Sequence, residues 1–126
     1  MGMTRAVLAR ELRLEEIRFI AERASIEVEV FVHGALCFSH SGQCYLSAMI
    51  GRRSGNRGMC AQPCRMQYSL GGRMDDYPLS LKDNCLAERL FELEEAGVAC
   101  VKIEGRMKRP EYTGIVTGVY AKLLRE

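Results

Sequence analysis

Residues Ile26–Val32 read IEVEVFV, a run in which β-branched residues alternate with other side chains. Alternation with a period of two over four to eight residues is typical of a β-strand. Gly34 ends this run. A second strand-like run, Val98–Ile103 (VACVKI), lies near the C-terminal end of the sequence. We expect both runs to form strands, and helical patterns lie between and around them.

The helical pattern is clearest at Leu14–Ala24, where apolar residues recur at mixed spacings of three and four. Further expected elements are a strand at Arg5–Ala9, a helix at Gln43–Ile50, a loop at Gly51–Gly58, a strand at Met66–Leu70, a turn at Gly71–Gly72, a helix at Cys85–Ala96 with Asp83 as N-cap and Gly97 beyond its end, and a helix at Glu111–Leu124 behind Pro110. Strands that alternate with helices predict an α/β protein with a parallel sheet.

This order of elements amounts to about four βα units with an irregular cysteine-rich insert. A parallel sheet of this kind is either doubly wound or part of a (β/α)₈ barrel, and a full barrel needs about 250 residues. The chain has 126 residues. Half a barrel would leave two open sheet edges. We therefore interpret residues 1–126 as a single fragment of a (β/α) barrel whose N-terminal half is missing.

Charge and hydropathy exclude several classes of protein. The sequence has 18 Lys and Arg and 16 Asp and Glu, so its net charge is only +2, far from that of a polybasic tail. No apolar run approaches the roughly 20 residues of a membrane span. The N-terminus lacks the apolar centre of a signal peptide. We expect a cytoplasmic protein without a membrane partner.

The arginines are unevenly spread. The segment Arg52–Arg73 contains five arginines and no acidic residue. Contacts with RNA phosphates depend on Arg and Lys, so these side chains are candidates for RNA contact. The alternative is that they are simply solvated loop residues. The candidates are Arg52, Arg53, Arg57 and Arg65.

Six cysteines are the strongest chemical signal in the sequence. In a reducing compartment, clustered cysteines indicate metal binding or catalysis rather than disulfides. Four lie close together with the spacing C-x6-C-x15-C-x3-C, within a cysteine-rich segment at 33–65. We expect them to meet at the carboxyl end of the sheet, where parallel α/β folds place their sites. The four are Cys37, Cys44, Cys60 and Cys64.

The spacing of these four thiols favours an iron–sulfur cluster over zinc. Structural zinc sites commonly pair cysteines two to four residues apart, and only Cys60 and Cys64 fit that rule. Iron–sulfur ligation tolerates irregular spacing better. Unliganded cysteines stay open as an alternative, because free cysteine is often buried. We expect Cys85 to be a core residue of a helix, and Cys100 to be either a core residue or a residue that points at the cluster.

Several long motifs resemble the collagenase-like peptidases, family thirty-two of the peptidases of unknown catalytic type. The resemblance extends over nearly the whole chain. The motifs are EVFVHGALC at 29–37, GQCYLS at 42–47, SGNRGMCAQPCR at 54–65, KIEGRMK at 102–108 and PEY at 110–112. Relatives in that family are longer, so this chain corresponds to the later part of a barrel-like catalytic domain.

The family name implies proteolysis of collagen, whereas several relatives act in oxygen-independent hydroxylation. Some of those relatives modify the wobble uridine of transfer RNA, some modify ribosomal RNA, and some act on a ubiquinone precursor. The resemblance implies a [4Fe–4S] cluster held by four cysteines, and prephenate as the oxygen source of the transfer-RNA enzymes. It carries Cys37, Cys44, Cys60 and Cys64 over as ligands, with Cys100 as an alternative to Cys64.

The residues themselves favour hydroxylation over proteolysis. A cysteine protease needs one thiolate beside a histidine base, and His33 and His40 both lie near Cys37 in the sequence. Such a dyad would leave the other cysteines without a role. The sequence has no G-x-S-x-G motif and no H-E-x-x-H motif. The peptidase, with a protein substrate, stays the second hypothesis, and an inactive fragment or a structural partner subunit is the third.

Four further residues are candidate catalytic residues. Glu104 and Arg106 directly follow an expected strand, so they either bind an acidic cosubstrate and position a base, or form a salt bridge that fixes the loop. Lys102 either meets a phosphate or carboxylate, or pairs with Glu29. His33 completes the set, and the glycines near the cysteines are expected to form tight turns.

Overall fold

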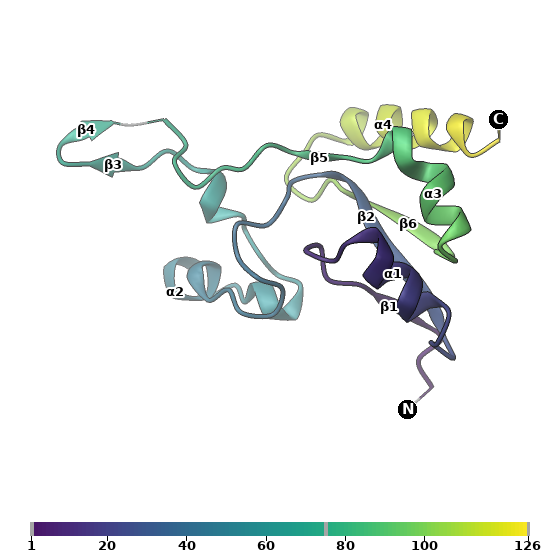
Figure 1. Cartoon of the computed structure of the whole chain (residues 1–126). Helices are drawn as coiled ribbons and strands as arrows, with labels where there is room; N and C mark the ends of the chain where they lie inside the picture. The colour runs from purple at the N-terminus through teal and green to yellow at the C-terminus, as the bar shows by residue number, and fades with distance from the viewer. Residues whose placement is uncertain (1, 75, 126) are drawn as a thin grey trace. The chain divides into compact units, whose positions relative to one another are not determined.

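Strand β2 (Glu27–Gly34) is the centre of the sheet in the computed structural model, which describes residues 2–74 and 76–125. It pairs in parallel with β1 (Arg5–Val7) on one part of its length and with β6 (Cys100–Glu104) on another (Figure 1). The two alternating runs are thus confirmed as strands of one parallel sheet. A register shift between Phe31 and His33 interrupts the pairing with β6.

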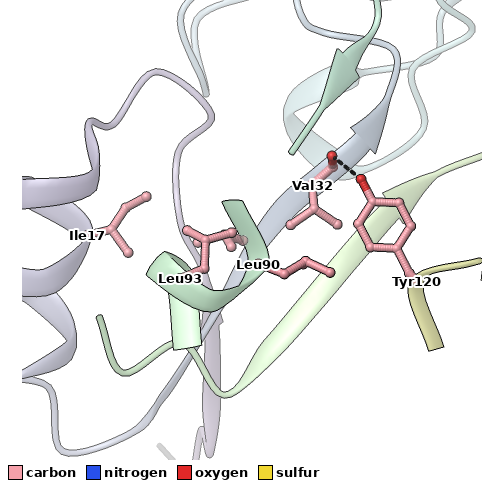
Figure 2. Close-up of a cluster of buried hydrophobic side chains, with 6 residues drawn as sticks. Ile17, Val32, Leu90, Leu93 and Tyr120 are labelled. Carbon is pink, nitrogen blue, oxygen red and sulfur yellow. Dashed lines mark hydrogen bonds between the residues drawn. The ribbon is translucent and has the colours of Figure 1, made fainter. Parts of the chain in front are cut away.

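Three helices pack their apolar side chains on one face of this sheet. They are α1 (Leu14–Ala21), α3 (Leu90–Glu95) and α4 (Pro110–Leu123). Figure 2 shows side chains from these helices around Val32, which is fully buried. Removing such apolar surface from water is the main favourable term in folding. The core consists of Ile17, Val30, Val32, Leu90, Leu93 and Tyr120.

The opposite face of the same strands is polar, because successive side chains of a strand point to opposite sides. Glu29 is buried and forms an ion pair with Lys102, with 2.9 Å between Glu29 Oε1 and Lys102 Nζ. The Arg10 guanidinium lies 4.0 Å from the centre of the Phe31 ring. The α/β class is confirmed, and the sheet has one apolar and one charged face.

The ends of the helices follow local sequence rules. Pro110 occupies the first turn of α4, where its missing N–H costs no hydrogen bond. Gly97 follows α3 with a φ of 86°, and its N–H donates to the Glu94 carbonyl at 2.9 Å. Both were expected from the sequence. Gly34 has a φ of 97°, and a Cβ there would lie 2.2 Å from the Glu104 carbonyl oxygen.

The expected helix over Cys85–Ala96 was wrong in its first part. Asn84–Cys85 forms the short strand β5, antiparallel to the end of β2, and Cys85 is exposed rather than part of a core. A 3₁₀ turn, η3 (Ala87–Arg89), precedes α3. The Asn84 side chain donates to the Phe31 carbonyl at 3.1 Å. Because α3 begins at Leu90 with Arg89 as its N-cap, Asp83 does not cap the helix. Sequence periodicity detected the helix but missed this strand pairing, because the partner is distant in sequence.

The chain divides into two compact units. Unit 1 comprises Met1–Ala35 and Asp83–Glu126, and unit 2 comprises Leu36–Lys82. Unit 2 contains one short helix and two 3₁₀ turns, with a hairpin at its far end. These elements are α2 (Leu46–Gly51), η1 (Gly55–Arg57), η2 (Pro63–Arg65), β3 (Ser69–Leu70) and β4 (Arg73–Met74).

The hairpin corrects the expected number of βα units. The expected strand at Met66–Leu70 is confirmed at Ser69–Leu70, but it pairs antiparallel with β4 in a sheet of its own. Gly71 and Gly72 form the turn, both with positive φ. The described residues therefore contain three parallel strands rather than about four. Within the same residues, no helix combines the length and apolarity needed to cross a lipid bilayer.

Candidate functional site

Unit 2 contains the four clustered cysteines, Cys37, Cys44, Cys60 and Cys64. All four are partly buried free thiols. Buried groups are scarce around them, since Ser47 and Pro63 are the only buried residues of unit 2 among those described. The thiols therefore do not sit in an apolar core.

The other three cysteines of the set influence the pKa of Cys64. Burial raises the pKa of the Cys64 thiol, the Arg65 guanidinium opposes this by lowering it, and the other three cysteines raise it again. Like charges disfavour ionisation only at short range, because water and salt screen distant charges. Cys64 therefore responds electrostatically to thiols as far as 27 positions away in the sequence.

Backbone groups approach Cys60 closely. The Gln62 N–H donates to the Cys60 Sγ at 3.2 Å. A Cβ at Gly55 would lie 3.5 Å from the Cys60 Cβ and 3.9 Å from the Cys44 carbonyl oxygen. Hydrogen bonds to sulfur stabilise the thiolate and tune the potential of iron–sulfur centres. Gln62 adopts a left-handed φ of 54°, which is uncommon for a residue other than glycine.

Polar side chains hold the segments that carry the cysteines. The hydroxyl of buried Ser47, in α2, accepts a hydrogen bond from the Ala61 N–H at 3.0 Å. The Arg65 guanidinium donates to the Leu36 carbonyl at 3.0 Å and to the Ser80 hydroxyl at 2.7 Å, and also to the Leu81 carbonyl. Arg65 therefore ties together the segments beside Cys37 and Cys64.

The donor set fits a thiolate-bound metal centre in its chemistry. Four half-buried thiols from one unit match the ligand number of iron–sulfur clusters and of structural zinc. Across residues 2–74 and 76–125, no group of three or more His, Cys, Asp or Glu side chains stands at a metal-ligating spacing.

The two other cysteines belong to unit 1. Cys100 lies in β6 opposite Glu29, and its pKa is raised by burial and by that carboxylate. Cys85 lies beside Tyr120, whose pKa burial and the Cys85 thiol raise to about 12. The use of Cys100 as an alternative ligand stays a prediction.

The predicted catalytic residues also belong to unit 1. Glu104 is buried, accepts the backbone N–H of Arg106 at 2.9 Å and lies 3.7 Å from the Arg10 guanidinium. The hydrogen bond from the Arg106 backbone to Glu104 thus supports the alternative in which Glu104 fixes the loop. Lys102 makes the pair with Glu29 that was its structural alternative. These contacts position the residues and leave their catalytic role a prediction.

His33 packs against α4. Its Nδ1 lies 3.2 Å from the Tyr120 hydroxyl, which donates to the Val32 carbonyl at 3.0 Å (Figure 2 shows the second bond). The His33 ring also contacts the Tyr112 ring, with centroids 6.0 Å apart. The bulge in β2 directs His33 toward the helices, an orientation that alternation alone does not predict.

Sequence reasoning missed two residues that build the sites. Arg10 contacts both Phe31 and Glu104, although it lies outside every motif considered. Ser47 anchors the Cys60–Cys64 segment. Its position in the GQCYLS motif was the available signal, whereas Arg10 had none.

Comparison with known proteins identifies the family. The model of peptidase family U32 matches residues 1–126. The "23S rRNA 5-hydroxycytidine C2501 synthase" of Escherichia coli (strain K12) is 45% identical over 98% of this chain and 20% of its own length. The "tRNA hydroxylation protein P1" of Bacillus subtilis (strain 168) is 40% identical over 98% of this chain and 32% of its own length.

A relative with a different name is also similar. The "Collagenase" of Porphyromonas gingivalis (strain ATCC BAA-308 / W83) is 37% identical over 94% of this chain and 33% of its own length. The chain thus spans a fifth to a third of the length of these relatives. No solved structure matches the chain significantly. With a family match over its whole length and motifs that resemble the family throughout, the chain belongs to peptidase family U32.

Proposed function

We propose that this chain is part of an enzyme that hydroxylates RNA, with a [4Fe–4S] cluster held by Cys37, Cys44, Cys60 and Cys64. The cluster would supply the electron-transfer chemistry, while the protein supplies ligands, orientation and electrostatics. The finer parts of the proposal are the wobble uridine of transfer RNA as the target, prephenate as the oxygen source and a cytoplasmic location.

One observation supports the cluster assignment: the unit that carries the four thiols has almost no apolar core. Unit 2 spans Leu36–Lys82, and in its described part only Ser47 and Pro63 are buried. Units of about this size rarely fold on an apolar core alone and use disulfides or metals instead. The cysteines of unit 2 are free thiols. A bound cluster would supply the missing stabilisation and would give the four cysteines of this unit a common role.

The named relatives support RNA as the substrate. Two of the relatives above carry names that refer to ribosomal and transfer RNA hydroxylation. Unit 1 supports the partial-barrel part of the proposal, because its helices α1, α3 and α4 all pack on one sheet face. In a (β/α)₈ barrel, helices likewise cover only the outer face of the sheet. The charged inner face would then carry Glu104, Lys102 and Arg10 toward an acidic cosubstrate.

Iron and sulfide quantification after anaerobic purification tests the cluster. We expect about four irons and four sulfides per chain, as in a [4Fe–4S] cluster, and loss of most iron in Cys37→Ala, Cys44→Ala, Cys60→Ala and Cys64→Ala. Cys85→Ala is the matched control, because Cys85 is an exposed thiol of unit 1. Full iron content in all four variants would refute the ligand assignment.

The activity is tested on the full-length protein that contains this chain. RNA from a strain that lacks it should lose one hydroxylated pyrimidine nucleoside by mass spectrometry, and wild type should restore it while Cys64→Ala does not. The relative named a collagenase favours a second outcome. Cleavage of gelatin by purified protein, with unchanged RNA nucleosides in the deletion strain, would replace hydroxylation by proteolysis.

A further inference from the structure

Unit 2 has a one-sided charge. From 36 to 74 the sequence contains five arginines and no acidic residue. The chain as a whole carries only +2, so this segment holds a surplus of positive charge that the rest of the chain offsets. Unit 2 runs on to Lys82 and includes two aspartates after Met74, so its arginines stay in surplus. A surplus of arginines on one small unit creates a local positive potential that attracts polyanions.

Four of these five arginines have contacts or exposure that separate their roles. Arg65 is engaged inside unit 2 by the carbonyls of Leu36 and Leu81 and the Ser80 hydroxyl. Arg53 is exposed, and its Nε donates to the Met59 carbonyl at 3.0 Å. Arg52 and Arg57 are also exposed, at the end of α2 and in η1. The loop after α2 thus presents three guanidinium groups, which we call the arginine rim (Arg52, Arg53 and Arg57).

Large apolar side chains are exposed on the helix that leads into this rim. Tyr45, directly before α2, is 65% exposed, and Met49 and Ile50 within α2 are 82% and 61% exposed. The helix and η1 belong to the same unit, and the Arg53 N–H between them donates to the Ser47 carbonyl of the helix at 3.2 Å. Tyr45 precedes the helix and Arg52 follows it, so the ring and the rim lie at the two ends of one short helix. Exposed aromatic rings and arginines on one surface bind unpaired nucleotides, by stacking on bases and pairing with phosphates.

We propose that the arginine rim and Tyr45 form the surface that binds the single-stranded part of the RNA substrate. The proposal rests on the proposed RNA hydroxylation and adds where and how the RNA is held. Arg52 and Arg57 contact phosphates, and Tyr45 stacks on an unpaired base. The same unit carries the cysteines, with Gly55 of η1 next to Cys60, so this surface would bring a base close to the cluster.

Binding of a labelled 12-nucleotide single-stranded RNA to the full chain, purified anaerobically, tests this surface. The double variant Arg52→Glu/Arg57→Glu should bind about tenfold or more weakly, and its log–log salt slope should fall by about 1.4, or 0.7 per lost phosphate contact. Arg18→Glu/Arg125→Glu changes the net charge equally on unit 1 and is the matched control. Arg52→Lys/Arg57→Lys should keep most of the affinity.

Tyr45→Ala tests stacking. It should weaken RNA binding about tenfold without changing the salt slope, while Tyr45→Phe binds as wild type. Equal losses in the rim variant and its control, or unchanged binding by Tyr45→Ala, would overturn the proposal. Displacement of the RNA by polyglutamate at equal charge concentration would also overturn the proposal, and would indicate that the surface binds an acidic protein.

The two proposals fail independently. Iron content of the rim variants reports on the cluster, since neither Arg52 nor Arg57 is a ligand. Normal RNA binding by a chain without iron would refute only the cluster, and an iron-loaded chain whose rim variants bind RNA normally would refute only this surface.

Discussion

Units 1 and 2 differ in what holds them together. Unit 1 has a continuous apolar core between the sheet and three helices, centred on Val32. Unit 2 is held by hydrogen bonds that Arg65 donates and Ser47 accepts, and it contains four of the six cysteines. Burial of apolar side chains therefore stabilises unit 1, whereas polar contacts hold unit 2, to which the proposed cluster would add further stability.

Removal of iron should give the largest effect and confine it to unit 2. With an iron chelator under reducing conditions, we expect amide protection in unit 2 to fall about 1000-fold or more, because ligand binding free energy is folding free energy in such units. Unit 1 should keep its protection. Hydrogen exchange with mass spectrometry measures both in one sample. Equal amide protection of unit 2 with and without iron would refute the claim that a bound cluster stabilises this unit.

Leu93→Ala should produce the reverse pattern. Leu93 is 4% exposed in the core of unit 1, and truncation of a buried leucine costs about 2–5 kcal/mol. Urea unfolding followed by exchange in β2 and β6 should show this loss. The control is Phe91→Ala, at a neighbouring position that is 70% exposed, where we expect a change within about 0.5 kcal/mol. Equal losses in the two variants would contradict a buried core.

Arg65→Met should weaken unit 2 by about 1.5–3 kcal/mol, because hydrogen bonds from a charged donor are lost. It should also raise the pKa of Cys64 further, since the guanidinium lowers it. The thiolate is the nucleophile, so the pH midpoint of Cys64 alkylation by iodoacetamide in the iron-free chain should move upward. Arg65→Lys keeps the charge and should move it less. An unchanged alkylation midpoint in Arg65→Met would show that Arg65 does not influence the Cys64 thiol.

Lys102→Met should have the smallest effect, below about 1 kcal/mol, because Lys102 is half-exposed. The hydrogen bond from Lys102 lowers the pKa of Glu29. A lowered carboxyl pKa adds stability above the ordinary carboxyl pKa and loses it as the pH falls through the folded pKa. The variant should therefore lose less stability than wild type between pH 7 and pH 3. Parallel urea titrations check this, with Arg18→Met as control, and identical pH dependence would contradict the pair.

Much of unit 1 could be predicted from the sequence, because its elements follow periodicity and local rules. The alternation at 26–32, the helix at 14–21 and the Pro110 start of α4 all appear in the structure. The predictions that failed concern non-local pairing. The strand at Cys85 forms by pairing with His33, 52 positions away in the sequence. Strand β3 pairs with β4 in a hairpin and so does not belong to the parallel sheet. Period-two patterns do not specify partners.

For unit 2, the sequence indicated the cysteines but not the contacts that gather them. Spacing alone left five candidate ligands open, and the fold places Cys100 in the other unit. Arg65 looked like a solvated loop arginine, yet it joins three segments. Such contacts depend on chain reversals at Gln62 and Arg52, which adopt left-handed conformations that their residue types do not favour.

The absent side chain at Gly34 sets a limit on how this region can vary. A single methyl group there would overlap the Glu104 carbonyl oxygen, and the φ of 97° is itself strained for any residue with a Cβ. Substitution would therefore wedge the two strand ends apart at the point where the chain departs toward Cys37. Only glycine fits at this position, so substitutions at the point where the chain leaves the sheet for unit 2 should be poorly tolerated.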